Sequence, residues 1–432
     1  MLKIYKIIED LKSKYKSDIV FDTRLIKKND IFIGLKTKNN DGSLYYNEAI
    51  KKKAALVIVN IYNTHPKLLY VRDTHLFIKK FCKFILDSYK GKIIAVTGSV
   101  GKTTFKENIY HILRNNNLKT YRSYKNYNNI LGLQFSIMNM NLNTDYSIFE
   151  LGINNSREMT KLVKTLRPHY CLVTCIENSH IGNFRNFKHL IDNKLKIFNS
   201  DRLINGLINY NYQSDYIRNK LSANVKLVNI ENINKESKKI NNKVIINFTE
   251  NNRKHKIESN MENIYENIAI ISFLFLKKII KKFNLNMFFY KDSIIESRGN
   301  EISTFINKKK VKFFDHSYNA SPYSLNKQIL LFNKRNINQK VFILGSMKEL
   351  GDQSDFFHLQ TIELVNKLNL NKILFIGEEF YKFKKNFRNF NFYMNYIPVL
   401  KYLNKEIDTI TNIFVMGSRY NKLDKIIKKY AS

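Results

Sequence analysis

One short glycine-containing stretch, KIIAVTGSVGKTTFK at residues 92–106, holds the residue types best suited to binding a phosphorylated ligand. Its apolar half predicts a buried strand, its glycines allow a tight turn, and the residues from Thr103 onward predict a helix start. Backbone N–H groups at a helix N-terminus attract an anion, Lys102 can bridge terminal phosphates, and the Thr103 hydroxyl can bind Mg²⁺. The full P-loop pattern has a glycine where this chain has Val96, so the motif is the shortened TGxxGKT. Its strand–turn–helix context favours nucleotide binding over a plain Gly-Ser turn.

Polar side chains follow two further predicted strands. Glu150 ends an apolar strand downstream of the phosphate-binding turn at residues 97–104, which we call the cradle. This is the place where a second Mg²⁺ contact is expected after such a turn. The alternative is a charged strand end that faces solvent. His180 follows the strand predicted at residues 171–177, and carboxyl ends of strands in open α/β sheets meet at one edge. His180 is therefore a candidate ligand or orienting group, with a structural histidine as the alternative. A helix over residues 188–198 places Lys194 near the same edge, where a solvated lysine is the alternative.

The composition is that of a globular chain. With 44% hydrophobic and 13% aromatic residues in a length of 432, it can bury several cores and form two to four domains. No apolar run approaches the ~18 residues of a membrane helix, and the N-terminal segment lacks a signal-peptide core. Three cysteines suit a reducing compartment rather than a disulfide framework. We therefore expect a cytoplasmic protein without membrane insertion.

The formal net charge of +37 suggests nucleic-acid binding as a possible function. The lysines are nevertheless scattered, enriched together with asparagine and isoleucine, and form no basic stripe interleaved with aromatic residues. A chain-wide compositional bias explains this pattern better than a binding face, so we expect no nucleic-acid partner. A positive field would still attract polyanionic substrates such as nucleotides.

The order of predicted strands and helices indicates an α/β fold of three domains. Residues 1–82 form a small N-terminal α/β domain, and residues 83–297 form a central, mostly parallel sheet like that of P-loop ATPases. Residues 298–432 contain strand–Gly–helix units at VFILGS, KILFIGE and IFVMGS, which predict a Rossmann-like doubly wound sheet. No loop of this last domain reads GxGxxG, so dinucleotide binding is not indicated.

Other polar residues become candidate ligand contacts only in combination with these motifs. Asn263 and Asn267 lie four apart on a helix predicted over residues 261–283 and could hold an adenine edge; helix caps or solvent contacts are the alternative. Two polar turns of the first domain, which alone indicate only turns, contain Asp22, Thr23, Arg24, Asp41 and Gly42.

With these residues assembled, the chain resembles the Mur ligases, and among them the MurF type, over essentially its whole length. TGSVGKTT is similar to the ATP loop of the family, and KNYNNILG is similar to its GNxNNxxG segment. ELG, RPHYCLVTCIENSHIGNF and NKLKIF resemble the segments that supply a Mg²⁺ glutamate, a Mg²⁺ histidine and a modified lysine. The most diagnostic segment is DHSYNASPYSL at residues 315–325, which resembles the DxSYNANPxS of the MurF type. LGSMKELG with His358, and GSR near the C-terminus, support the same assignment.

The resemblance implies an ATP-dependent amide ligase that adds D-alanyl-D-alanine to UDP-N-acetylmuramoyl-tripeptide through an acyl phosphate. The product would serve peptidoglycan synthesis, and through it cell-wall growth, cell shape and cell division. ATP would be a substrate and Mg²⁺ the cofactor, a carbamate on Lys194 would help to bind a second Mg²⁺, and the enzyme is expected to be a monomer. The implied catalytic residues are Lys102, Glu150, His180 and Lys194, and the implied metal ligands are Thr103, Glu150, His180 and Lys194. The implied ATP contacts are Thr97, Gly98, Ser99, Val100, Gly101, Lys102, Thr103, Thr104, Asn267, Arg298 and Asp315. The implied contacts to the other substrates are Asp22, Thr23, Arg24, Asp41, Gly42, Asn128, Asn129, Tyr318 and Asn319.

Four positions depart from the family pattern. Lys196 replaces a glutamate, Ser346 an aspartate, Ser43 the histidine of a DGH turn, and Asn263 a histidine. The change at Lys196 would affect the second metal site, and the change at Ser346 would affect docking of the dipeptide. The alternatives to the leading hypothesis are a tripeptide synthetase or folate-type ligase on the same scaffold, a catalytically weak binding protein, and a basic ATPase acting on nucleic acid.

Overall fold

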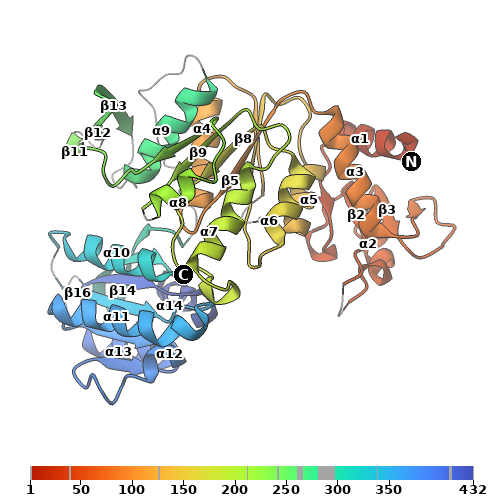
Figure 1. The fold of residues 1–432 in the computed structure, drawn as a ribbon. Coiled ribbons are helices and arrows are strands. Elements are labelled where there is room, and N and C mark those ends of the chain that lie inside the picture. The colour runs from red at the N-terminus through yellow and green to blue at the C-terminus, as the bar shows by residue number, and fades with distance from the viewer. Residues whose placement is uncertain are drawn as a thin grey trace.

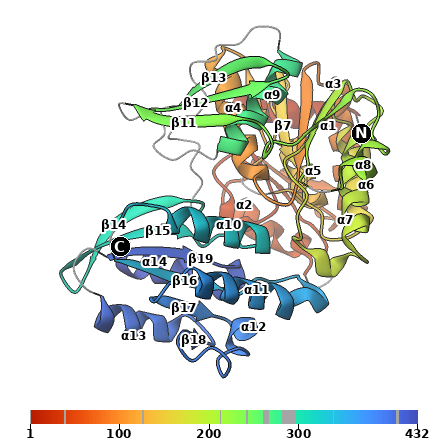
Figure 2. The same cartoon turned by 60° about the vertical axis from the view of Figure 1, so that its left-hand side comes forward.

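The computed structural model describes residues 2–37, 40–124, 127–211, 213–240, 243–259, 266–280, 297–337, 339–407 and 411–431. These residues form four sheets in an α/β fold of three domains, so the predicted fold class is confirmed. The N-terminal domain lies beside the central domain, and the C-terminal domain lies below the central one in both views (Figures 1 and 2). No helix of the described residues has the length and apolar character needed to cross a bilayer.

The N-terminal domain is a small parallel sheet with strand order β1-β2-β3-β4, flanked by helices. Its central strands β2 and β3 are buried except for the first residue of β3, as expected for a parallel sheet covered on both faces. The elements are α1 (Leu2–Tyr15), β1 (Ile19–Val20), η1 (Thr23–Leu25), β2 (Ile31–Ile33), η2 (Gly42–Tyr45), α2 (Tyr46–Lys51), β3 (Leu56–Val59), β4 (Leu68–Tyr70) and α3 (Thr74–Ser88).

The central domain is built on a parallel sheet of strand order β10-β9-β8-β5-β7-β6. β5 is buried except for its first residue and lies in the middle, which places the cradle at the centre of the carboxyl edge. Its elements are β5 (Lys92–Thr97), α4 (Lys102–Asn115), β6 (Thr120–Arg122), α5 (Ile130–Met138), β7 (Tyr146–Glu150), α6 (Glu158–Leu166), β8 (Tyr170–Val173), η3 (Ile181–Asn183), α7 (Phe187–Leu195), η4 (Lys196–Phe198), β9 (Asn205–Asn209), α8 (Ser214–Arg218) and β10 (Val225–Val228).

A three-stranded antiparallel sheet, β11 (Lys235–Ile240), β12 (Lys243–Glu250) and β13 (Arg253–Ser259), follows, and then α9 (Glu266–Ile279). α9 packs on α4, where the rings of Phe105 and Phe275 meet edge to face. Asn263 and the outer ends of the helix predicted over residues 261–283 lie outside the described residues.

The strand predicted to reach residue 177 ends earlier, at Val173. The next residues turn toward the cradle instead of continuing a ladder. The Thr174 hydroxyl donates to the Val100 carbonyl at 2.5 Å, and the Ser99 amide donates to the Cys175 carbonyl at 2.9 Å. The strand prediction was wrong there because hydrogen bonds to the cradle replace those of a neighbouring strand.

The C-terminal sheet has the order β14-β15-β19-β16-β17-β18, with only the edge pair β14 and β15 antiparallel among its described pairings. The order reverses between β19 and β16, so the loops after these two strands lie at a switch point, where ligands of such sheets bind. The elements are β14 (Asn300–Ile306), β15 (Lys309–His316), α10 (Pro322–Asn333), β16 (Lys340–Gly345), η6 (Gly351–Gln353), α11 (Ser354–Lys367), β17 (Ile373–Ile376), α12 (Glu378–Tyr381), β18 (Asn391–Tyr393), α13 (Ile397–Glu406), β19 (Thr411–Met416), η7 (Arg419–Asn421) and α14 (Asp424–Ala431).

Candidate active site

The cradle between β5 and α4 depends on two glycines in the left-handed region of backbone space. Gly98 has φ +147° and Gly101 has φ +84°, which side chains disfavour. A Cβ at Gly98 would also lie only 2.0 Å from the Thr174 hydroxyl oxygen. The turn therefore brings backbone amides and the N-terminus of α4 to one point, which suits an anion. The other predicted cradle residues lie in this turn or beside it: Thr97, Ser99, Val100 and Thr104.

Lys102 begins α4 and folds back over the cradle. Its Nζ donates to the Gly98 carbonyl at 2.7 Å and to the Ser99 carbonyl at 3.3 Å. Burial lowers the pKa of Lys102, while the nearby Glu150 charge acts in the opposite direction. The lysine thus lies over the point where the terminal phosphates of a nucleotide would be held.

Glu150 is only 2% exposed, and each of its carboxylate oxygens accepts a hydrogen bond from a neutral side chain. The Thr103 hydroxyl donates to Oε2 at 2.7 Å, and Asn128 Nδ2 donates to Oε1 at 3.0 Å. A buried carboxylate beside a hydroxyl is a hard-oxygen donor pair of the kind that Mg²⁺ prefers. Asn128, which belongs to the KNYNNILG segment, therefore holds the carboxylate of Glu150, the predicted metal ligand, by a hydrogen bond.

His180 and Lys194 lie close enough to Lys102 for its charge to lower their pKa values. Burial, followed by the charges of Lys102 and Lys194, lowers the pKa of His180 to about 4. Burial, followed by the charge of Lys102, lowers the pKa of Lys194 to about 7, and its side chain is almost completely buried. Together with the effect of Glu150 on Lys102, these influences place the four residues in one site.

The segment leading into the C-terminal domain also reaches this site. The Arg298 guanidinium lies 4.0 Å above the Tyr318 ring, and its charge contributes to lowering the pKa of Lys102. Asp315 is the second-last residue of β15 and accepts a hydrogen bond from the Ser317 amide at 2.9 Å. Arg298 is thus brought to the cradle together with the loop at residues 317–319, which we call the SYN loop after its sequence.

Several predicted contact residues have other partners in this structure. Asn267 donates to Glu231 at 3.0 Å, and the Asn129 side chain caps α5 by accepting from Gly132 at 2.8 Å. Asn319 is exposed.

The remaining predicted substrate contacts lie in the N-terminal domain rather than at the cradle. Asp22 accepts from the backbone and guanidinium of Arg24, next to Thr23 in η1, while Asp41 caps η2 beside Gly42.

The departures from the family pattern have identifiable partners. Lys196 Nζ donates to Asn193 Oδ1 at 2.6 Å, within the same NKLKIF segment. Ser346 is fully buried and donates to Asn421 Oδ1 at 3.0 Å. Ser43 is also fully buried, and its hydroxyl accepts from the backbone of its own domain.

Sequence reasoning missed the cavities between the central and C-terminal domains. Glu177 lines both cavities, and burial raises its pKa to about 7. Nearby, Glu231 accepts from Lys327 at 2.7 Å and from Tyr323 at 3.1 Å, which joins the two domains. Only the docking of the domains creates this arrangement, so no local pattern signals it. One cavity of about 720 Å³ is lined by Glu177, Asn178, Asn211, Glu231, Tyr323 and Lys327 among others.

The cradle with its lysine, a hydroxyl-bonded glutamate, a histidine and a buried lysine lie at one edge of the central sheet, and residues of the Rossmann-like C-terminal domain reach this edge. The fold and the site are together those of an ATP-dependent ligase of the Mur class. The Mur ligase middle domain matches residues 96–276. The chain belongs to the Mur ligase family, and to its MurF type, because a relative of that name is 30% identical over nearly the whole of both chains.

UDP-N-acetylmuramoyl-tripeptide–D-alanyl-D-alanine ligase of Buchnera aphidicola subsp. Baizongia pistaciae is 30% identical, with 95% of this chain and 91% of the relative covered. The enzyme of the same name from Rickettsia prowazekii is 28% identical, with 96% and 95% covered. Among solved structures, MurF from Acinetobacter baumannii matches with a TM-score of 0.76 and 20% identity, covering 98% of each chain. MurF ligase from Thermotoga maritima in complex with ADP matches with a TM-score of 0.77 and 19% identity, covering 95% of this chain and 96% of the other.

Proposed function

We propose that this protein uses ATP to join D-alanyl-D-alanine to the terminal carboxylate of UDP-N-acetylmuramoyl-tripeptide in peptidoglycan precursor synthesis. The observation that carries the proposal is the convergence of Lys102, the Thr103–Glu150 pair, His180 and Lys194 at the carboxyl edge of one sheet. The names of the relatives supply the substrates.

The first step brings two anions together, because a substrate carboxylate oxygen must attack the γ-phosphorus of ATP. Lys102 and the positive end of α4 counter this charge, so the carboxylate can form an acyl phosphate as ADP leaves. The dipeptide amine then attacks the carbonyl carbon, loses a proton and displaces phosphate, which leaves the amide. A closed arrangement of the central and C-terminal domains would exclude water from the acyl phosphate.

The donor set fits a magnesium ion. Thr103 and Glu150 offer hard oxygens 2.7 Å apart, and Mg²⁺ commonly takes one or two protein oxygens together with phosphates and water. The Thr97 hydroxyl is buried with no hydrogen-bond partner among the described residues, so a polar atom of the cradle is also available to a ligand. Thr103, Glu150 and His180 would hold the ion, which when bound neutralises phosphate charge and acts as a Lewis acid.

Lys194 is proposed to be carbamylated. Its neutral amine attacks CO₂ and releases a proton, which converts the side chain into an anion. The lowered pKa, about 7, supports this reaction because it leaves much of the amine unprotonated near neutral pH. A carbamate placed near Lys102 and His180 would replace a repulsive cation by a metal-binding carboxylate-like group.

The remaining roles belong to the same proposal. The polar turns of the N-terminal domain would bind the UDP end of the sugar-peptide, and the SYN loop and Asn128–Asn129 would contact the substrates. Asn267, Arg298 and Asp315 would contact adenosine or phosphate. We further propose a domain limit at residues 297/298, a monomer, and a location in the cytoplasm, where ATP and the nucleotide-linked precursor are made. The limit expected from the sequence at residues 82/83 falls inside α3, so we propose that the first limit lies after this helix.

The test is an ADP-release assay with two UDP-tripeptides, one with lysine and one with meso-diaminopimelate as its third residue. Each is assayed with and without D-alanyl-D-alanine. We expect release that depends on both substrates and a product of the combined mass. Absence of dipeptide-dependent release with both tripeptides would overturn the proposed activity.

A further inference from the structure

A glutamate side chain of the C-terminal domain contacts His180, the proposed metal histidine. Glu349 Oε2 contacts His180 Nδ1 within hydrogen-bonding distance. Glu349 lies between β16 and η6, whereas His180 directly precedes η3 of the central domain. The contact therefore joins residues 169 positions apart on two different domains.

The backbones of the two loops approach so closely that glycine is needed on both sides. The Gly182 amide donates to the Glu349 carbonyl at 3.2 Å. A Cβ at Gly182 would lie 2.4 Å from the Gly351 nitrogen, and a Cβ at Gly351 would lie 2.7 Å from the Gly182 Cα. Gly351 also has φ +57°, where a side chain is disfavoured. This close approach of the two backbones fixes the position of Glu349 relative to His180.

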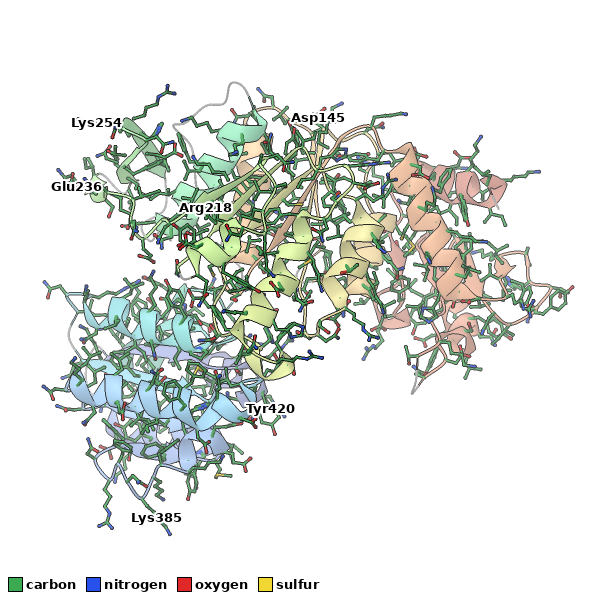
Figure 3. The ribbon with its side chains drawn as sticks, viewed as in Figure 1. Asp145, Arg218, Glu236, Lys254, Lys385 and Tyr420 are labelled. Atoms are coloured by element: carbon green, nitrogen blue, oxygen red, sulfur yellow. The ribbon has the colours of Figure 1, made fainter. Side chains whose placement is uncertain are left out.

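The loop that carries Glu349 is held by its own domain. The Met347 amide donates to His358 Nε2 at 2.9 Å, and the Lys348 amide donates to the Ser418 hydroxyl at 3.0 Å. The Lys348 ammonium lies 4.3 Å from the ring centroid of Tyr420, which is labelled on the C-terminal domain in Figure 3. Because these contacts hold the loop, movement of the C-terminal domain would carry Glu349 with it.

The contact also determines which nitrogen of His180 is protonated. An ionised carboxylate can only accept a hydrogen bond, so Nδ1 must be the donor. In a neutral imidazole Nε2 then keeps its lone pair and is free to bind a cation. A carboxylate that accepts from the second nitrogen is the usual means of orienting a metal-binding histidine.

We propose that Glu349 is a positioning residue that holds His180 in the Nδ1–H tautomer, and that docking of the C-terminal domain thereby completes the metal site. This inference rests on the proposed function, in which His180 binds Mg²⁺. The metal site would then be fully assembled only in molecules whose loops are joined at Gly182 and Gly351.

Full-length Glu349→Ala and Glu349→Gln variants test the proposal, with Asp352→Asn as a matched control. Asp352 is an exposed acid on the same loop. Histidine ¹⁵N NMR without metal reports the tautomer, and loss of a signal in His180→Ala assigns it among the nine histidines. We expect Nδ1–H in the wild type and in Glu349→Gln, whose amide oxygen can still accept, and the Nε2–H form in Glu349→Ala.

The second readout is the Mg²⁺ concentration that half-saturates ADP release. We expect an increase of about 10–100-fold in Glu349→Ala, as for loss of a partner of a metal-binding histidine, and a smaller increase in Glu349→Gln. Asp352→Asn should match the wild type in both readouts. Gly182→Ala separates the loops without removing the carboxylate, so it should reproduce the Glu349→Ala result.

A wild-type tautomer or a wild-type Mg²⁺ requirement in Glu349→Ala would overturn the inference. An unchanged Mg²⁺ requirement in His180→Ala would instead show that the proposed ligand role of His180 is wrong. The two failures are distinguishable because the tautomer is measured on protein without metal or substrate.

Discussion

The Thr103 hydroxyl donates a 2.7 Å hydrogen bond to the carboxylate of Glu150, which lies 47 positions later in the sequence. The register of the central sheet explains this contact. β5 and β7 are parallel neighbours, and Val96 pairs with Glu150, so the end of β7 lies beside the start of the cradle. The hydroxyl and the carboxylate are thus preassembled at the point where phosphate and Mg²⁺ would bind.

Glu150→Gln keeps the shape of this side chain but removes its charge. We expect at least about a 100-fold loss of ADP release at low Mg²⁺, because an amide is a weak ligand for a hard cation. Raised Mg²⁺ should restore part of the rate. Glu236→Gln, on the exposed strand β11 (Figure 3), is the control and should behave as wild type. Equal Mg²⁺ titration curves for Glu150→Gln and wild type would rule out a metal role.

Lys102→Ala removes the cation over the cradle. We expect a loss of about 10²–10³-fold or more in turnover, as for other groups that stabilise charge in a transition state. The circular dichroism spectrum should be unchanged, because Lys102 donates only to carbonyls of its own turn among the described contacts. Lys254→Ala, at an exposed residue of β13, is the matched control (Figure 3). Substantial residual turnover in Lys102→Ala would contradict the phosphate role.

Lys194→Ala deletes the proposed carbamate. We expect activity to fall strongly and to be partly restored by formate or acetate, because a small carboxylate can occupy the place of the carbamate. Steady-state ADP release with increasing acid concentration measures this rescue. Lys188→Ala, on the same helix, should show neither the loss nor the rescue. Full activity of Lys194→Ala without added acid would contradict carbamylation.

The pH profile provides a separate check on Lys194. Its amine becomes protonated as the pH falls through about 7, and a protonated amine cannot react with CO₂. Activity of protein equilibrated at each pH should therefore decline below about 7, and added bicarbonate should shift the decline to lower pH. The response to bicarbonate distinguishes Lys194 from His180, because protonation of an imidazole involves no reaction with CO₂. Glu177 also titrates near pH 7, so a decline that persists in Glu177→Gln and responds to bicarbonate is the expected result.

Ser346→Asp restores the residue usual in the family but should destabilise this chain. Ser346 is fully buried, donates to Asn421 Oδ1, and lies close enough to the Glu379 carboxylate to influence its pKa. An aspartate could not donate and would place a second negative charge there, at a cost of at least about 2 kcal/mol. Ser346→Ala should cost about 1 kcal/mol. Midpoints of thermal unfolding measure both effects, and an aspartate variant as stable as wild type would contradict this account.

Much of the site could be predicted because its parts are local or follow from a general property of sheets. Gly98, Gly101 and Lys102 lie within one turn, whose chemistry depends on neighbours in the sequence. Glu150 and His180 follow parallel strands, and parallel strands end at the same edge. Their proximity was therefore predictable without coordinates. The prediction of a strand through residue 177 was wrong because Thr174 and Cys175 form hydrogen bonds with the cradle. The pattern of apolar residues in the sequence does not indicate such tertiary contacts.

The sequence by itself determined the three-domain α/β fold, the phosphate cradle and the side chains gathered at the edge of the central sheet. These features depend on short-range backbone preferences and on the period of apolar residues. Only the tertiary structure decided that Glu349 meets His180, that Gly182 and Gly351 touch, and that Ser346 is sealed against Asn421. Such contacts depend on how separately folded domains and loops dock, and docking is set by the shapes of whole surfaces rather than by residues near one another in the chain.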